Sequence, residues 1–147
     1  MPVFNGEKYL ELAIKSIINQ SYGNFEFLIL NDGSTDSSQE IIDRFAANDN
    51  RLRTISRENR GIVASLNELV AWAAGDYIAR MDCDDVAYPD RLERQLSFLI
   101  ENQLDVCGSQ VNCTSIHRFR RLKPTKHNEL IFHSLYDTPF WHPTVLS

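Results

Sequence analysis

The sequence predicts an α/β fold with a mostly parallel sheet flanked by helices. Three observations support it: short apolar runs alternate with longer segments of helical periodicity, the runs end in polar turn residues, and this order repeats through residue 102. Strands that alternate with helices of this length are typical of βαβ units with right-handed crossovers. A length of 147 residues suits a single domain with its own core.

The first half of the chain predicts two helix and strand pairs. Asn5 is placed to cap the first turn of the first helix, and Ser37 and Glu40 have the spacing of a capping box for the second helix. A strand of six mostly apolar residues that stops at a turn is typical of a buried strand. The predicted elements are a helix over 6–20, a strand over 25–30, a helix over 37–47 and a strand over 52–55.

The second half of the chain continues the alternation of predicted strands and helices to about residue 102, after which the pattern weakens. Gly75 breaks the third helix, and Pro89 stands where the fourth helix would begin. The expected elements are a helix over 62–74, a strand over 77–81, a helix from 89 to about 102, one strand within 105–115, a short helix over 127–135 and a last segment over 140–146. We find no repeats and no linkers, so one domain is expected.

The first five residues predict the tail of a strand. A helix starts only a few positions later, whereas a central strand usually has about five or six residues. We therefore expect the chain to begin inside its own first strand.

Composition and charge exclude several classes of protein. The net charge is −5 and basic residues are scattered, which argues against a broad nucleic-acid-binding face. One basic run exists (Arg118, Arg120, Arg121 and Lys123), and a solvated loop is favoured there over a contact with anionic lipid or acceptor. Three cysteines without a CxxC pair do not predict a zinc site or a disulfide framework. No apolar run spans a bilayer, so a soluble cytoplasmic protein is expected.

Polar side chains follow the predicted strands. Asn5 and Asp32 come at the ends of the first and second strands, and a later strand ends at Asp82, Cys83, Asp84 and Asp85. In open parallel sheets ligands bind beyond the carboxyl ends of the strands, so we expect these residues at one edge. Asp32, at a strand end, would accept hydrogen bonds from a nucleobase imide or a ribose hydroxyl. For Gly33, Ser34 and Asp36 we keep the interpretation as turn and capping residues.

The acidic run over 82–85 predicts a cation site. Three carboxylates within four residues repel each other, and a divalent ion is a natural counter-charge. Oxygen ligands favour Mg²⁺ or Mn²⁺, which usually take one or two carboxylates and complete their shell with substrate phosphates. The alternative is a solvated turn in which Asp85 caps the helix that begins near Pro89.

The chain resembles the bacterial family 2 glycosyltransferases. The resemblance rests on motifs that occur in order over residues 1 to about 100, with a further match at His142-Pro143-Thr144-Val145. The motifs are Met1-Pro2-Val3-Phe4-Asn5-Gly6, Tyr9-Leu10, Ser16-Ile17, Asn19-Gln20-Ser21-Tyr22, Phe25-Glu26, Asn31-Asp32-Gly33-Ser34-Thr35-Asp36, Asn59-x-Gly61, Ala79-Arg80-Met81-Asp82-Cys83-Asp84-Asp85 and Pro89-x-Arg91-Leu92.

This resemblance implies a GT-A-type, Rossmann-like domain over residues 1–147 that is truncated in its first strand and in its C-terminal part. It implies a metal-dependent transfer of a sugar, with inversion, from a UDP-, GDP- or dTDP-sugar to a hydroxyl of a carbohydrate or lipid-linked acceptor, as in the synthesis of cell-surface polysaccharide or glycolipid. It also implies donor-binding residues (Pro2, Val3, Phe4, Asp32, Arg60, Asp82 and Asp84) and Mg²⁺ or Mn²⁺ ligands (Asp84, Asp82 and Asp85).

Several alternatives stay open. The catalytic base of the family lies beyond residue 147, so the rival interpretation is a truncated nucleotide-sugar-binding module without turnover. Trp141 and His142 are candidates for the acceptor side; His142 lies there or near the metal, or its loop only packs against Trp141. Association with the inner face of the membrane also stays open. A phosphoacceptor domain is disfavoured, because its acidic pair would follow the first strand, where Asn5 stands.

Overall fold

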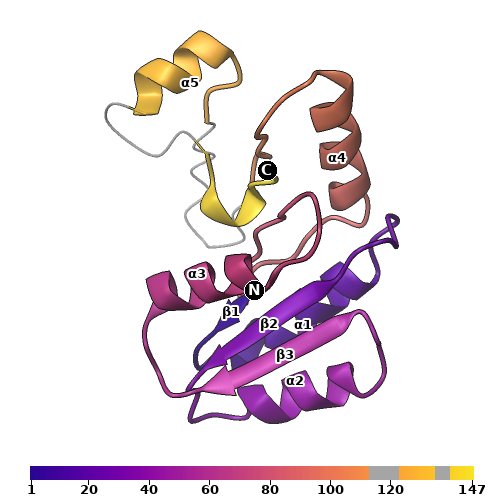
Figure 1. The fold of residues 1–147 in the computed structure, drawn as a ribbon, viewed down its shortest axis with the longest axis vertical. Helices are drawn as coiled ribbons and strands as arrows, with labels where there is room; N and C mark the ends of the chain where they lie inside the picture. Colours follow the sequence, from indigo (N-terminus) through magenta and orange to yellow (C-terminus); the bar gives the residue numbers. More distant parts are fainter. Residues whose placement is uncertain (113–122, 135–139) are drawn as a thin grey trace.

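The computed structural model describes residues 1–112, 123–134 and 140–147. A three-stranded parallel sheet in the order β1-β2-β3 organises the first part of the chain (Figure 1). The strands are β1 (Pro2–Val3), β2 (Phe27–Asp32) and β3 (Leu52–Arg57). The helices are α1 (Glu7–Ile18), α2 (Ser38–Ala46), α3 (Ile62–Trp72), α4 (Arg91–Glu101) and α5 (His127–Ser134), and a 3₁₀ turn spans His142–Thr144.

Helices cover both faces of the sheet. The helices α1 and α2 pack against each other on one face, and α3 contacts β1 and β2 on the other (Figure 1). The strand β2 is buried along nearly its whole length, which explains why its sequence is a continuous apolar run rather than an alternating one. The main core lies between the sheet and α1, where Leu10, Ile14 and Ile29 are fully buried. The predicted α/β fold is therefore confirmed.

The predicted strand over 77–81 is wrong as a member of the parallel sheet. Ala79 forms a single antiparallel bridge with Leu146, flanked by hydrogen bonds from Ile78 to Ser147 and from Arg80 to Val145. The strand β1 contributes only two residues to the sheet, so this segment has no long edge to pair with on that side. Leu146 also bridges Cys107, which is the only pairing in 105–112 of the strand predicted over 105–115; residues 113–115 lie outside the described part.

The remaining predictions for the C-terminal part have mixed outcomes. The short helix predicted over 127–135 is present as α5. Most of the basic run over 118–123 lies outside the described residues. Within the parts of the chain that the structure describes, no helix combines the length and the apolar character required to cross a bilayer.

The amine of Met1 occupies a position of the β1–β2 ladder. It donates a hydrogen bond to the carbonyl oxygen of Leu28 over 2.7 Å, and the carbonyl of Met1 accepts one from the N–H of Leu30. Burial lowers the pKa of this amine from 8.0 to about 5, although the nearby Asp82 carboxylate opposes the effect. A buried ammonium is costly, so the folded chain favours the neutral amine.

The free energy of unfolding should rise with pH between about 5 and 8 because of this amine. In that window the unfolded chain binds a proton that the folded chain does not, so stability increases as the proton leaves. The gain reaches up to about 4 kcal/mol. Chemical denaturation at several pH values, with free and N-terminally acetylated chains, measures it. Equal pH slopes for the two chains would contradict the assignment.

Candidate functional site

The loop between β1 and α1 is hydrogen-bonded to the loop that follows β2. The N–H of Asn5 donates to Ser34 Oγ over 3.0 Å, and the N–H of Thr35 donates to Asn5 Oδ1 over 2.8 Å. Asn5 holds a positive φ of 50°, a conformation that asparagine tolerates better than most residues. The prediction that Asn5 caps α1 is wrong, because its side chain is bonded to the neighbouring loop instead.

Asp36 caps two helices at once. Its carboxylate accepts hydrogen bonds from the N–H of Glu7 in α1 and from the N–H of Ser38 in α2, each over 3.0 Å. The capping box predicted from Ser37 and Glu40 does not form, since Ser37 makes no side-chain cap bond. The capping role that the sequence assigned to Asp36 is confirmed, and it fixes the loop over 31–36 in place.

Asp32 is the last residue of β2 and is only 3% exposed. Its Oδ1 accepts hydrogen bonds from the N–H of Arg60, over 2.9 Å, and from the guanidinium of Arg57. Its Oδ2 accepts one from the N–H of Gly61 over 2.9 Å. Burial alone would raise the pKa of Asp32, but these donors outweigh it and hold the pKa below 3.8. The carboxylate therefore stays ionised and anchors the start of α3.

Arg57 is the residue of this cluster that the sequence analysis missed. Its side chain is 11% exposed and bonds the carboxylates of Asp32 and Glu68 together with the hydroxyl of Ser65. The sequence held one signal for this ion pair. Asp32 and Arg57 each stand at the last position of a strand, and the two residues are register partners on neighbouring strands. The predicted base-binding carboxylate is thus part of a buried ion-pair cluster.

The acidic turn over 82–85 lies against the β1–α1 loop. Cys83 is half-buried there, near the backbone N–H of Phe4, and its Sγ would lie 3.1 Å from a Cβ added to Gly6. Burial, followed by the charge of Asp84, raises the pKa of the Cys83 thiol. Both the loop after β2 and the acidic turn therefore contact the loop after β1. Asp32 and Asp82 form no hydrogen bond or ion pair with each other in the structure.

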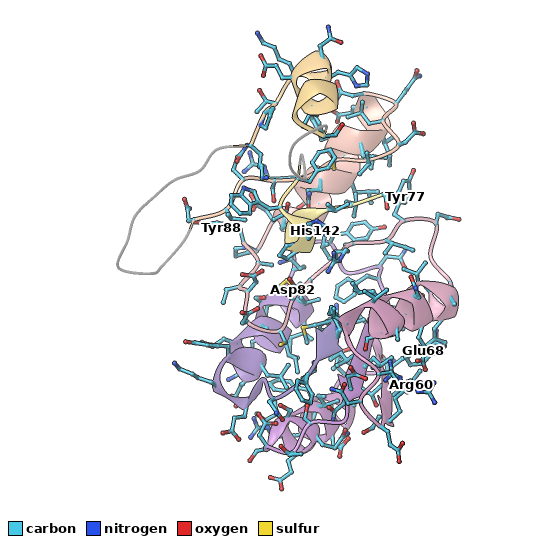
Figure 2. The ribbon with its side chains drawn as sticks, turned by 90° about the vertical axis from the view of Figure 1, so that its left-hand side faces the viewer. Arg60, Glu68, Tyr77, Asp82, Tyr88 and His142 are labelled. Atoms are coloured by element: carbon cyan, nitrogen blue, oxygen red, sulfur yellow. The ribbon has the colours of Figure 1, made fainter. Side chains whose placement is uncertain are left out.

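Arg80 joins the acidic turn to His142. It donates from Nη2 to Asp82 Oδ1 over 3.3 Å, and its Nη1 lies 3.0 Å from His142 Nδ1. Because arginine only donates, this contact requires His142 Nδ1 to be the acceptor. Figure 2 shows Asp82 and His142 near each other, whereas Arg60 lies beside α3. His142 is therefore next to the acidic turn.

Arg91 supplies a second positive charge near the acidic turn. It donates to the carbonyl oxygens of Arg80 and Pro143 over 2.8 and 2.9 Å, and so links the segment before the turn to the His142 loop. Burial raises the pKa of Asp85, and the charges of Asp84 and Asp82 add to this rise, while Arg91 opposes it. Two arginines thus provide part of the counter-charge that the sequence analysis assigned to a divalent ion.

The donor set suits a cation held partly by a substrate. Among the described residues no group of three or more His, Cys, Asp or Glu side chains is arranged to hold a metal. Asp84 is exposed and makes no hydrogen bond or ion pair with a described residue, so its oxygens can accept a ligand. Mg²⁺ and Mn²⁺ need only one or two protein carboxylates when phosphates complete the shell. The residues present fit that mode of binding.

The other predicted site residues differ in accessibility. Pro2 and Val3 are buried in β1, whereas Phe4 is 53% exposed at its end and Arg60 is exposed beside α3. The ring of Trp141 is covered by Lys123, whose Nζ lies 5.2 Å from the ring centroid. An acceptor contact by Trp141 stays a prediction.

Replacing Arg57 with methionine should destabilise the fold by about 3–5 kcal/mol, since it leaves the Asp32 carboxylate buried without its charge partner. Arg44→Met is the matched control: it removes an ion pair with Glu11 whose two side chains are 58% and 42% exposed, and its effect should stay below about 1 kcal/mol. Urea unfolding at pH 7 compares the two variants. Equal losses of stability would contradict the role of Arg57.

Comparison with known proteins agrees with this geometry. The family model described as glycosyl transferase family 2 matches residues 1–145. A glycosyltransferase of Haemophilus influenzae, described as uncharacterized, is 44% identical over 105 residues, which cover 71% of this chain and 42% of that protein. The chondroitin synthase of Pasteurella multocida is 35% identical over 112 residues, covering 76% of this chain and 12% of the synthase. The chain therefore spans less than half the length of these relatives.

Solved structures share the fold. The crystal structure of S. aureus TarS 1–349 superposes with a TM-score of 0.74 at 24% identity, covering 99% of this chain and 44% of that one. The mannosyltransferase PcManGT from Pyrobaculum calidifontis, solved with GDP-Man and Mn²⁺, superposes with a TM-score of 0.68 at 23% identity, covering 76% of this chain and 34% of that one. The fold is thus that of the GT-A glycosyltransferases, and the chain belongs to glycosyl transferase family 2.

Proposed function

We propose that this chain supplies the donor-binding part of a glycosyltransferase that takes its sugar from a nucleoside diphosphate. One observation carries the proposal: the acidic turn lies against the loop after β1, which is itself bonded to the loop after β2. Ligands of open parallel sheets bind at this edge. TarS 1–349 has been solved in complex with UDP-GlcNAc, and PcManGT with GDP-Man, which supports a nucleotide sugar as the donor.

The nucleoside would lie between the end of β1 and the start of α3. Phe4 offers an exposed aromatic ring for stacking on the base, and Pro2 and Val3 fix the backbone that carries it. Asp32 Oδ2 accepts one hydrogen bond and keeps a second acceptor position for a base or ribose donor. The exposed Arg60 would reach the nucleotide from the α3 side.

The diphosphate would lie at the acidic turn. Asp84 would hold a divalent ion, with Asp82 binding the donor or sharing the metal and Asp85 as a third candidate ligand. Bound there, Mg²⁺ or Mn²⁺ supplies Lewis-acid stabilisation of the charge on the departing nucleoside diphosphate. Arg80 holds Asp82 in position and brings His142 beside it.

The sugar would then be transferred with inversion. An acceptor hydroxyl attacks the anomeric carbon from the face opposite the nucleoside diphosphate, and a base removes its proton, a contribution of about 10²–10⁴-fold. The family resemblance puts that base beyond residue 147. Trp141 and His142 are proposed to face the acceptor, which is a carbohydrate or a lipid-linked sugar handled in the cytoplasm, including at the inner face of the membrane.

The rival proposal is a module that binds the donor without transferring the sugar. A catalytic base beyond residue 147 favours this rival, because residues 1–147 alone would then bind a nucleotide sugar without turnover. Incubation of the purified chain with UDP-, GDP- and dTDP-sugars and Mn²⁺ separates the two: release of nucleoside diphosphate supports the enzyme, and binding without release supports the module.

Substitution of the acidic turn tests donor binding directly. Asp84→Asn should weaken the Mn²⁺-dependent affinity for the nucleotide sugar at least about 10-fold, because a ligand charge is lost. Asp90→Asn, which changes a carboxylate just before α4, is the matched control and should bind as the parent does. Isothermal calorimetry with and without Mn²⁺ measures both. Equal affinities for the two variants would refute the placement of the diphosphate.

A further inference from the structure

The contact between Arg80 and His142 fixes which nitrogen of the histidine carries its proton. Nη1 of Arg80 lies 3.0 Å from Nδ1 of His142, and a guanidinium donates hydrogen bonds but cannot accept them. Nδ1 is therefore the acceptor, so the neutral ring carries its proton on Nε2. His142 is exposed, and its Nε2 makes no hydrogen bond with any residue that the structure describes. The ring thus offers an N–H donor to a ligand beside the acidic turn.

The main chain holds these two side chains next to each other. Arg91 donates to the carbonyl oxygens of Arg80 and Pro143, over 2.8 and 2.9 Å. The N–H of Arg80 also donates to the carbonyl oxygen of Val145 over 2.8 Å. These hydrogen bonds join the segment before the acidic turn to the loop that carries His142. The contact between Arg80 and His142 is therefore built into the fold.

The position of the proton decides between the roles left open for His142. A histidine that binds a metal through one nitrogen donates the N–H of its other nitrogen to a carboxylate, a carbonyl or water. The other nitrogen of His142 instead accepts a hydrogen bond from Arg80. A protonated Nε2 can neither coordinate a metal nor remove a proton from an acceptor hydroxyl. Donation of a hydrogen bond is the role that remains.

The same guanidinium holds Asp82, so a carboxylate lies near the N–H donor (Figure 2). Oδ1 of Asp82 accepts from Arg80, whereas Oδ2 makes no hydrogen bond with a residue in the described part of the chain. A sugar hydroxyl both donates and accepts, so two neighbouring hydroxyls match a carboxylate and an N–H group. Phosphate oxygens only accept and are repelled by a carboxylate. The pair of Asp82 and His142 therefore suits a sugar better than a phosphate.

We propose that Arg80 is a positioning residue that presents the Nε2–H of His142 to a hydroxyl oxygen of the donor sugar, beside Asp82. The inference rests on the proposed function and deepens it, because the transferred sugar lies between the departing diphosphate and the acceptor. His142 contacts this sugar from the acceptor side. The charge of Arg80 polarises the imidazole and strengthens Nε2–H as a donor. His142 is then neither a ligand of the metal nor the catalytic base.

NMR of the chain with ¹⁵N-labelled histidine tests the positioning step without a ligand. At about pH 8, which keeps ordinary imidazole rings neutral, the signals of His142 should be those of the Nε2–H tautomer alone. Arg80→Met should let the Nδ1–H form appear, whereas Arg94→Met, which removes an arginine that is 78% exposed on α4, should not. A parent ring in the Nδ1–H form, or a spectrum that Arg80→Met leaves unchanged, would overturn the proposal.

Calorimetry in the presence of Mn²⁺ tests the sugar contact, with UDP-, GDP- and dTDP-sugars each compared with its own nucleoside diphosphate. For the donor that the parent binds, His142→Ala should weaken the affinity about 3–10-fold, the loss expected for one hydrogen bond. The affinity for the matching nucleoside diphosphate should not change. His142→Gln should recover most of the loss, because its amide places an N–H donor near the position of Nε2. The shorter His142→Asn should not.

The possible results separate this inference from the proposed function. Failure of the parent chain to bind any of the nucleotide sugars would refute both. An equal loss of affinity for nucleotide sugar and nucleoside diphosphate in His142→Ala would indicate a contact with the diphosphate or its metal. That result, or equal affinities for His142→Gln and His142→Asn, would overturn the sugar contact and leave the proposed function standing.

Discussion

The buried carboxylate of Asp32 is the interaction on which the rest of the arrangement depends. It ends the central strand, and its partners come from the end of β3 and from Arg60 and Gly61, the two residues just before α3. A carboxylate that is 3% exposed is costly without donors, and here two backbone N–H groups and Arg57 satisfy it. The same contacts fix where α3 begins. The helix α3 packs on β1 and β2, so one ion-pair cluster links the proposed nucleotide edge to the packing of the sheet.

Much of the fold could be predicted from local sequence patterns. The strand over 27–32 and the helices α1, α2, α3 and α4 lie within a few residues of the predicted bounds, because each carries an uninterrupted apolar run or stripe. The segment 77–81 was predicted as a strand for the same reason. Its apolar residues are real, but membership of a sheet needs a partner edge, and β1 offers only two residues. Pairing over long sequence distances cannot be deduced from a run of residue types.

The sequence predicted where the candidate site lies better than it predicted which groups interact there. Polar residues after strands indicated an edge, and the contacts of Asn5 with Ser34 and of Gly6 with Cys83 agree with it. Counting carboxylates suggested a metal as their counter-charge, whereas the structure also places Arg80 and Arg91 there. Arg80 is two residues from Asp82, but its link to His142 and the link of Arg91 to Pro143 are tertiary contacts, which the sequence does not reveal. The same holds for Arg57, which meets Asp32 only through the register of β2 and β3.

We propose that the Asp32 cluster and the acidic turn bind one ligand. Amide NMR of the chain, titrated with UDP or GDP in the presence of Mn²⁺, tests this most directly, since a paramagnetic ion broadens the signals of amides near it. We expect broadening centred on Asp84 that extends to Phe4 and Gly6, together with shifts of Arg60 and Gly61 that saturate at the same nucleotide concentration. Broadening centred elsewhere, or saturation of the two regions at different concentrations, would contradict it.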